Sequence, residues 1–182
     1  MDDKELVVSL KDLPFKAEVK YLGNQPAKGL WGMKYTRKPV DYMVSQAKNL
    51  PPNKVLSLVK LEINLQGLKF HDITNRSERS PPVMFGIDAI SYGVQDLVYT
   101  RVFSMIVVTE NDLKNGVPFV CHSFVCRSRR EARQITYALA AAFQEYGRQA
   151  KIDEDGSKRK KFAIDLRTPE EQADASDEET EA

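Results

Sequence analysis

Four side chains are of types that both bind metals and exchange protons near neutral pH: two histidines and two cysteines. His122 lies between Cys121 and Cys126, in a run whose residues are typical of a β-strand. Positions five apart in a strand point to opposite faces, so the two thiols are poorly placed to share a zinc ion or form a disulfide. We therefore expect two buried strand thiols, no metal site and no cofactor.

Catalytic sets built from several side chains are also hard to assemble from this sequence. It has no Gly-rich phosphate loop, no nucleophile elbow and no paired metal-ligand spacing. The carboxylates are most densely placed in the C-terminal tail. A metal-free acid–base site stays open, but the pattern favours a binding module without catalytic residues over an enzyme.

Charge is distributed unevenly along the chain. Residues 168–182 hold seven acids and no Lys or Arg, whereas residues 1–167 carry 27 basic against 19 acidic side chains. A basic body suggests an anionic partner, and the acidic tail either screens that body or only keeps the chain in solution. The basic cluster at Lys158–Lys161 has no interleaved aromatic residues, so we expect no nucleic-acid binding.

Three features indicate the compartment. No apolar run approaches the roughly 20 residues needed to span a bilayer. The N-terminus lacks a basic segment followed by a long apolar one, so we expect no secretory signal. The few cysteines are typical of a reducing environment. We expect a cytoplasmic protein that can also be recruited to the plasma membrane.

The elements that must position any site begin with a strand. Alternating apolar and charged residues predict this strand over Phe15–Leu22, and Gly23 should end it. Apolar residues at helical spacing predict a short amphipathic helix. Pro39 should lie in its first turn, and Pro51–Pro52 should end it. Six further strand candidates follow: Val55–Leu65, Leu68–His71, Val83–Ile87, Ile90–Val94, Arg101–Thr109 and Pro118–Cys126.

The strongest helix signal begins at Ser128. Ser128 and Glu131 match a capping box, in which the hydroxyl accepts the Glu131 amide proton and the carboxylate bonds the cap amide. An apolar stripe follows at Ile135, Leu139, Ala142, Phe143 and Tyr146. This helix should run from Arg129 to about Gln149, over roughly 30 Å.

Together these elements predict a mainly β, α+β domain. About seven strands would form a β-sandwich or partly open barrel, with a short helix after the first strand and the long C-terminal helix capping an open corner. We expect an N-terminal arm at residues 1–12, one domain at 13–149, and a disordered tail at 150–182 that is first basic and then acidic.

Several strings resemble the phosphotyrosine-binding (PTB/PID) domains of adaptor proteins. Phe15–Gly23 (FKAEVKYLG) is similar to the family's first strand, and Ala89–Asp96 (AISYGVQD) resembles its peptide-pairing strand. Cys121–Cys126 (CHSFVC), followed by a long helix through Ala142-Phe143-Gln144, looks like the low-density-lipoprotein-receptor adaptor and Disabled branch. The resemblance covers roughly residues 13–148 and implies a pleckstrin-homology-like fold.

The resemblance implies an adaptor that binds an Asn-Pro-x-Tyr-type peptide from the cytoplasmic tail of a membrane receptor, in endocytosis or signalling. The peptide would add a strand beside Ile90, Ser91, Tyr92, Gly93 and Val94. It would pack along the final helix against Leu139 and Phe143, with its tyrosine end near Val108 and Phe119. The most similar branch binds unphosphorylated tyrosine, so we expect binding that does not depend on phosphate.

Two of these residues have structural explanations as well. Gly93 either lets another backbone approach closely or marks a β-bulge. Phe143 either packs against the peptide or belongs to the core, as apolar stripes on helices commonly do.

Related adaptor domains also bind phosphoinositide head groups through basic residues near the first strand and the short helix. Here those segments contain Lys16, Lys20, Lys34 and Lys54. Lys16 and Lys20 share one strand face by alternation. These lysines form either a lipid-binding patch or an ordinary solvated surface. The alternative function is therefore a pleckstrin-homology-like phosphoinositide-binding membrane module without a peptide ligand, and in both cases we expect a monomer.

Overall fold

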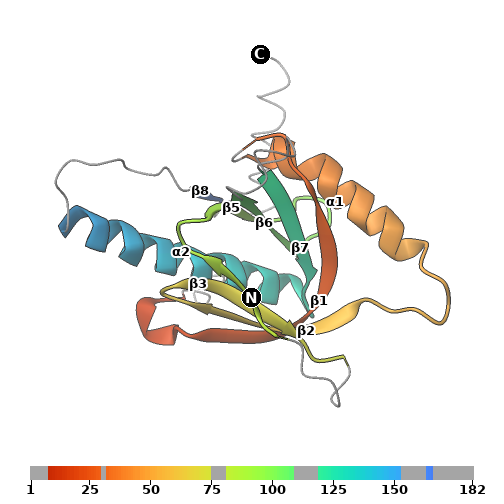
Figure 1. The fold of residues 1–182 in the computed structure, drawn as a ribbon, viewed down its shortest axis with the longest axis horizontal. Coiled ribbons are helices and arrows are strands. Elements are labelled where there is room, and N and C mark those ends of the chain that lie inside the picture. The colour runs from red at the N-terminus through yellow and green to blue at the C-terminus, as the bar shows by residue number, and fades with distance from the viewer. Residues whose placement is uncertain (1–7, 30–31, 75–80, 109–118, 153–162, 166–182) are drawn as a thin grey trace.

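The computed structural model describes residues 8–29, 32–74, 81–108, 119–152 and 163–165 (Figure 1). A short 3-10 turn at Leu10–Asp12 precedes the first strand. The helices are α1 (Met33–Lys48) and α2 (Arg129–Ile152). The strands are β1 (Phe15–Pro26), β2 (Ser57–Asn64), β3 (Gly67–Asp72), β4 (Val83–Gly86), β5 (Ile90–Gln95), β6 (Val102–Val108), β7 (Phe119–Val125) and β8 (Ala163–Asp165).

The strands form one strongly bent sheet in the order β4-β3-β2-β1-β7-β6-β5-β8. All neighbours are antiparallel except β5 and β8, which run parallel. The long β1 curves through the molecule and joins the two halves of the sheet (Figure 1). The predicted α+β architecture, with its short helix after the first strand and long helix near the end, is confirmed.

Gly23 does not end the first strand, contrary to the sequence-based expectation. It has a φ of +135°, which favours glycine, and it stands at a register shift in the pairing of β1 with β7. A bulge of this kind bends a strand without ending its pairing. As a result β1 continues to Pro26 and pairs with β2 over its first half and with β7 over its second.

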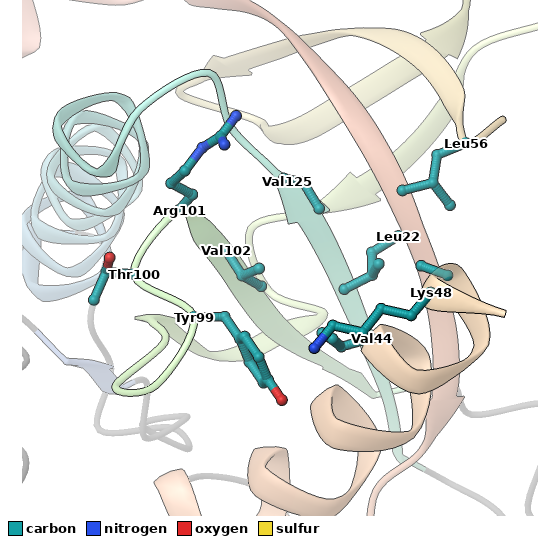
Figure 2. Close-up of a pocket in the computed structure, with 10 residues that line it drawn as sticks. Leu22, Val44, Lys48, Leu56, Tyr99, Thr100, Arg101, Val102 and Val125 are labelled. Carbon is teal, nitrogen blue, oxygen red and sulfur yellow. The ribbon is translucent and has the colours of Figure 1, made fainter. Parts of the chain in front are cut away.

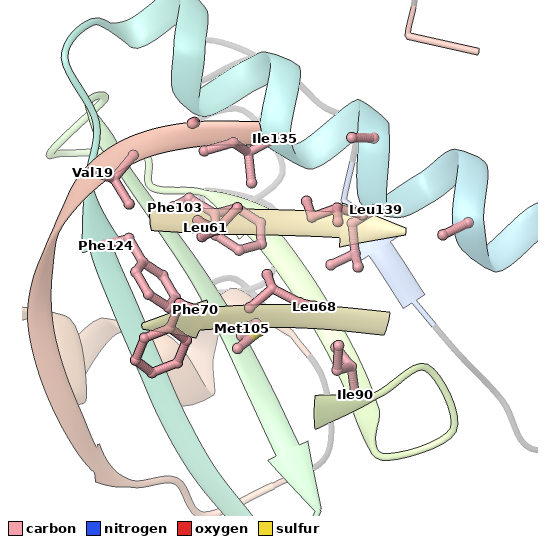
Figure 3. Packing of buried hydrophobic residues seen from close by; sticks show 14 of the residues in the cluster. Val19, Leu61, Leu68, Phe70, Ile90, Phe103, Met105, Phe124, Ile135 and Leu139 are labelled. Carbon is pink, nitrogen blue, oxygen red and sulfur yellow. The ribbon is translucent and has the colours of Figure 1, made fainter. Parts of the chain in front are cut away.

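Two apolar clusters lie on opposite faces of this sheet. The larger one lies beneath α2 (Figure 3) and includes Val19, Leu61, Leu68, Ile90, Phe103, Phe124, Ile135 and Leu139. The smaller one lies beneath α1 and includes Leu22, Val40, Met43, Tyr92, Val94, Val102, Ile106 and Cys121. We call them the α2-side and α1-side clusters. Strand β6 contributes to both, since its alternate side chains point to opposite faces and both faces are covered.

Helix α2 begins at Arg129 as predicted, although its cap differs in one bond. The Ser128 hydroxyl accepts the Glu131 amide proton at 3.1 Å. The Glu131 carboxylate, however, accepts the Arg127 amide proton at 2.9 Å, one residue before the expected partner. It also pairs with the Arg127 guanidinium at 2.7 Å, so the strand-to-helix connection is fixed by both side chains.

Helix α1 begins six residues before the predicted start. It follows Gly32, and Pro39 lies inside it rather than in its first turn. A proline ring removes one backbone hydrogen bond from a helix interior. Thr36, Pro39 and Val40 are all buried against the sheet, and this packing offsets the lost bond.

Both ends of the chain contribute more to the domain than the sequence predicted. Val8 packs against the α2-side cluster, so part of the arm belongs to the fold. In the range 150–182, α2 continues to Ile152 and Ala163–Asp165 form β8, which differs from the expected disordered tail. The pairing partner of β8 lies about 70 residues earlier, so no local pattern reveals it. The basic cluster and the acidic end lie outside the described residues.

Candidate functional site

Strand β5 ends the antiparallel part of the sheet, and all six of its residues are buried. Its pairing with β6 shifts register between Ile90 and Tyr92, which makes Ser91 the extra residue of a bulge. The Ser91 hydroxyl donates to the Ile106 carbonyl at 3.3 Å. The bulge therefore lies at Ser91, and the alternative explanation of Gly93 as the bulge residue does not hold.

The bulge also decides which side chains of β5 face α2. Tyr92 pairs with Ile106, and both belong to the α1-side cluster. Gly93 pairs with Met105, a member of the α2-side cluster. Since paired residues share a face, Gly93 faces α2 and places no side chain there. At this point β5 therefore presents only backbone toward α2.

Helix α2 forms the other wall. Leu139 is fully buried and Phe143 is 7% exposed, and both belong to the α2-side cluster. Figure 3 shows Leu139 on the side of α2 that faces the strands. At the far end of β5, the Gln95 amide donates to the Arg129 carbonyl at 3.1 Å and to the Thr100 carbonyl at 2.7 Å. These bonds fix the end of β5 to the start of α2.

The outer edge of β5 is occupied by the chain's own C-terminal segment. Tyr92, Gly93 and Val94 pair with residues 163, 164 and 165 of β8, in parallel orientation. Strand β8 also contacts α2, and Figure 1 shows it beside β5. We call the space bounded by β5 and α2 the β5–α2 groove. It contains an added strand in this structure.

The structure thus brings together β5, Leu139 and Phe143, which the sequence had assigned to one site. Val108 and Phe119 lie opposite each other on β6 and β7, and the Val108 amide donates to the Ala89 carbonyl at 2.8 Å. This bond places them at the start of β5. Contact of any of these residues with a ligand stays a prediction.

Unlike the residues of the β5–α2 groove, the four lysines of the predicted lipid patch do not all lie together. Lys16 pairs with Glu62 at 3.9 Å, and Lys20 lies further along the same exposed face of β1. Lys34 lies in the first turn of α1, whereas Lys54 follows the end of that helix. The two ends of α1, from Lys34 to Lys48, are about 21 Å apart at 1.5 Å per residue.

A pocket of about 390 Å³ opens on the α1 side of the sheet (Figure 2). Its polar lining residues are Lys48, Tyr99, Thr100 and Arg101. Its apolar walls come from Leu22, Val44, Ala47, Leu56, Val102 and Val125. Sequence reasoning missed this pocket because its residues come from five separate segments that have no common motif.

Charged side chains hold the connection after β5 against α1. Asp96 is 2% exposed and accepts the amide protons of Val98 and Tyr99 at 2.9 and 2.8 Å. Its carboxylate also pairs with the Arg37 guanidinium of α1 at 3.2 Å. The Arg37 guanidinium in turn lies 5.6 Å from the centre of the Tyr99 ring. This network shapes one rim of the pocket.

Three side chains whose types suit metal binding or proton exchange have structural roles in the fold: Cys121, His122 and Cys126. Cys121 belongs to the α1-side cluster and Cys126 to the α2-side cluster, on opposite faces as expected. Burial raises the pKa of each thiol to about 12. Burial also lowers the pKa of His122 to about 4, and its Nδ1 shares a 2.9 Å hydrogen bond with the Tyr21 hydroxyl. All three side chains are therefore uncharged at neutral pH.

Within the described part of the chain, three or more His, Cys, Asp or Glu side chains do not come together as metal ligands. Neither described helix is both long and apolar enough to cross a membrane.

Comparison with known proteins identifies one family. The sequence model of the phosphotyrosine interaction domain (PTB/PID) matches residues 16–169. The solution structure of the C-terminal phosphotyrosine interaction domain of APBB2 from mouse is similar, with a TM-score of 0.57 and 20% sequence identity. That similarity covers 72% of this chain and 87% of the mouse chain, and it shows the fold. No curated protein sequence matches.

Proposed function

The chain belongs to the phosphotyrosine interaction domain (PTB/PID) family, a family of protein-interaction modules that bind peptide motifs, and from this we propose a cytoplasmic adaptor that binds an extended peptide in the β5–α2 groove. The ligand in this proposal is an Asn-Pro-x-Tyr-type segment from the cytoplasmic tail of a membrane receptor. The role is endocytic or signalling, and no catalysis is involved.

One observation carries the proposal. The edge of β5 already pairs with an added strand, which also contacts α2. Strand addition supplies affinity through backbone hydrogen bonds, and neighbouring side chains then select the sequence. Gly93 faces α2 without a side chain, and Leu139 and Phe143 supply an apolar wall.

We further propose that binding does not require a phosphate on the ligand tyrosine. Phosphotyrosine is typically held by arginine forks that are available to it. One arginine near this region is engaged elsewhere, since Arg127 pairs with Glu131 at 2.7 Å.

The test is a titration of the full chain with receptor-tail peptides, each prepared with and without phosphate. Gly93→Val places a side chain between β5 and α2, so we expect at least a tenfold loss of affinity, about 1.4 kcal/mol. Gly147→Val is the matched control, because a Cβ at Gly147 meets nothing within 4 Å. Binding of no peptide, or unchanged binding by Gly93→Val, would contradict the proposal.

A second candidate function is contact with an anionic membrane surface that contains phosphoinositides. It is favoured by cations beside apolar side chains at the pocket mouth. Lys48 and Arg101 line the pocket, and in the described residues neither forms an ion pair. Val55 is 78% exposed and Val98 59% exposed, and each adjoins a lining residue in the sequence. Exposed apolar groups beside cations are typical of membrane-surface contacts.

This second function is tested by sedimentation with phosphoinositide vesicles. Lys48→Glu with Lys54→Glu should reduce binding several-fold, while Lys16→Glu with Lys34→Glu, an equal change of charge elsewhere, should have a smaller effect. Equal losses would favour a diffuse attraction of the whole basic body. Retained binding in both pairs would assign these lysines to the solvated surface.

A further inference from the structure

The occupied edge of β5 has a consequence beyond peptide binding itself. An uncovered sheet edge presents unpaired amide and carbonyl groups, and proteins commonly cover such edges. Here the cover is β8, which pairs with residues 92–94. It lies on the same edge, and against the same helix, where the proposed function places a partner peptide.

Strand β8 is a weak cover by itself. It is three residues long and pairs in parallel orientation, which is slightly less stable per residue than antiparallel pairing. Its connection to the fold compensates for this weakness, since only ten residues separate Ile152 at the end of α2 from Ala163. A tether of this length gives an effective concentration in the millimolar range, so even a weak segment can remain bound.

A second observation links β8 to the domain rather than to the tail. The match to the PTB/PID family ends at residue 169, four residues beyond β8. It therefore includes residues 163–165 and leaves out most of the acidic end.

We propose that residues 163–165 are an intramolecular ligand of the β5–α2 groove, and that a partner segment binds there only in exchange for β8. The nature of the partner rests on the proposed function, whereas the pairing of β8 with β5 does not. A partner that replaces β8 must be an extended segment that pairs with more of β5 than three residues. Strand β8 thus sets a minimum affinity for β5, and short or weakly pairing segments that fall below it do not bind in the groove.

The size of this threshold follows from competition. If the free segment binds with a dissociation constant of about 0.1 mM and the tether supplies about 1 mM, β8 lowers the apparent affinity of a partner about tenfold. Removing β8 from the groove should raise that affinity by the same factor.

The test uses the full chain with Ile164→Pro and Asp165→Pro together. Proline has no amide proton to donate, and adjacent prolines prevent pairing whichever of the two residues faces β5. Ala173→Pro with Asp174→Pro is the matched control, since it makes a similar change eight residues beyond β8. The probe is a fluorescent synthetic peptide with the sequence of residues 160–168.

We expect this probe to bind the 164/165 variant at least fivefold more tightly than the wild-type or control chain. Amide protons of residues 92–94 should also exchange faster with solvent in that variant when no probe is present. Equal affinity for all three chains, or binding to none of them, would overturn the proposal.

An Asn-Pro-x-Tyr peptide titrated against the same three chains separates the two proposals. Tighter binding to the 164/165 variant supports both. If the chain's own peptide shows the gain but no receptor peptide binds, the proposed function fails and the intramolecular ligand stands. Equal binding of the receptor peptide to all three chains would retain the proposed function and reject the exchange.

Discussion

The β5–α2 groove and the pocket beside α1 lie on opposite faces of the same sheet, and they are built in different ways. The groove is defined mainly by backbone: the edge of β5, a glycine that faces α2, and an added strand. The pocket is defined by side chains from five segments, with a buried ion pair at its rim. A backbone site can accept many sequences, whereas a side-chain site depends on each lining residue.

The largest expected effect tests whether Phe143 belongs to the groove or to the core beneath it. Phe143 is 7% exposed within the α2-side cluster, so Phe143→Ala should lower the free energy of unfolding by about 3–5 kcal/mol. Tyr137→Ala, which removes a half-buried aromatic ring from the same helix, should cost clearly less. Denaturant unfolding of both variants measures this. A loss of peptide affinity without loss of stability would assign Phe143 to the groove alone.

The next prediction concerns the pocket side of the sheet, where a buried carboxylate rather than apolar packing stabilises the structure. Asp96→Ala leaves Arg37 and two amide protons without their buried acceptor, so we expect a loss of about 2–4 kcal/mol. Asp41→Ala removes the other partner of Arg37. That carboxylate is 52% exposed, so its loss should lower the free energy of unfolding by less than about 1 kcal/mol. Comparable losses in thermal or denaturant unfolding would show that the buried position of Asp96 has no special importance.

A pH-dependent effect is expected on the α2 side, at His122. Burial lowers the pKa of this imidazole to about 4, so between pH 6.5 and 4 the unfolded chain binds the proton more readily than the folded one. The stability from the uncharged ring is present above pH 6.5 and is lost as the pH falls, by about 2 kcal/mol between pH 7 and pH 5.

His122→Gln isolates this contribution from that of the carboxylates, which titrate in both chains. The variant should lose less stability than the wild type when denaturant unfolding is repeated at pH 7 and pH 5. Identical losses in the two chains would show that His122 does not contribute to the pH dependence.

The smallest expected effect is that of the C-terminal segment on stability. Truncation after Gln149 removes β8 and the last three residues of α2, and among the side chains that the structure describes no member of either apolar cluster lies beyond Tyr146. We expect the melting temperature to change by less than about 3 °C, equivalent to roughly 1 kcal/mol. A drop of several degrees would mean that β8 stabilises the whole domain and is not merely an exchangeable strand of the groove.

Much of the domain could be predicted from sequence, because its elements have strong local patterns. The six later strands were located to within about two residues, and α2 began at the predicted residue. Its stripe of Ile135, Leu139 and Phe143 does face the core. The resemblance to the PTB/PID family then identified β5 as the strand of interest.

The misses share a physical cause, which is that distant contacts decide them. The bulge at Gly23 depends on pairing with β7, and the early start of α1 depends on burial against the sheet. Residues 163–165 have neither the length nor the alternation of a predictable strand, and they become one only beside β5. The pocket required the folded positions of five segments, so no sequence motif could predict it.

The bulge at Ser91 determines which face of the sheet each later residue of β5 points to. If Ser91 paired as an ordinary strand residue instead of being bulged, Tyr92 would turn toward α2 and Gly93 toward the α1-side cluster, because successive strand residues alternate between faces. The large ring would then block the groove, and the cluster beneath α1 would lose a buried side chain. Related domains should therefore inherit this bulge and the position of the glycine together. A deletion of Ser91, by contrast, would make Tyr92 follow Ile90 directly and would keep both residues on their present faces.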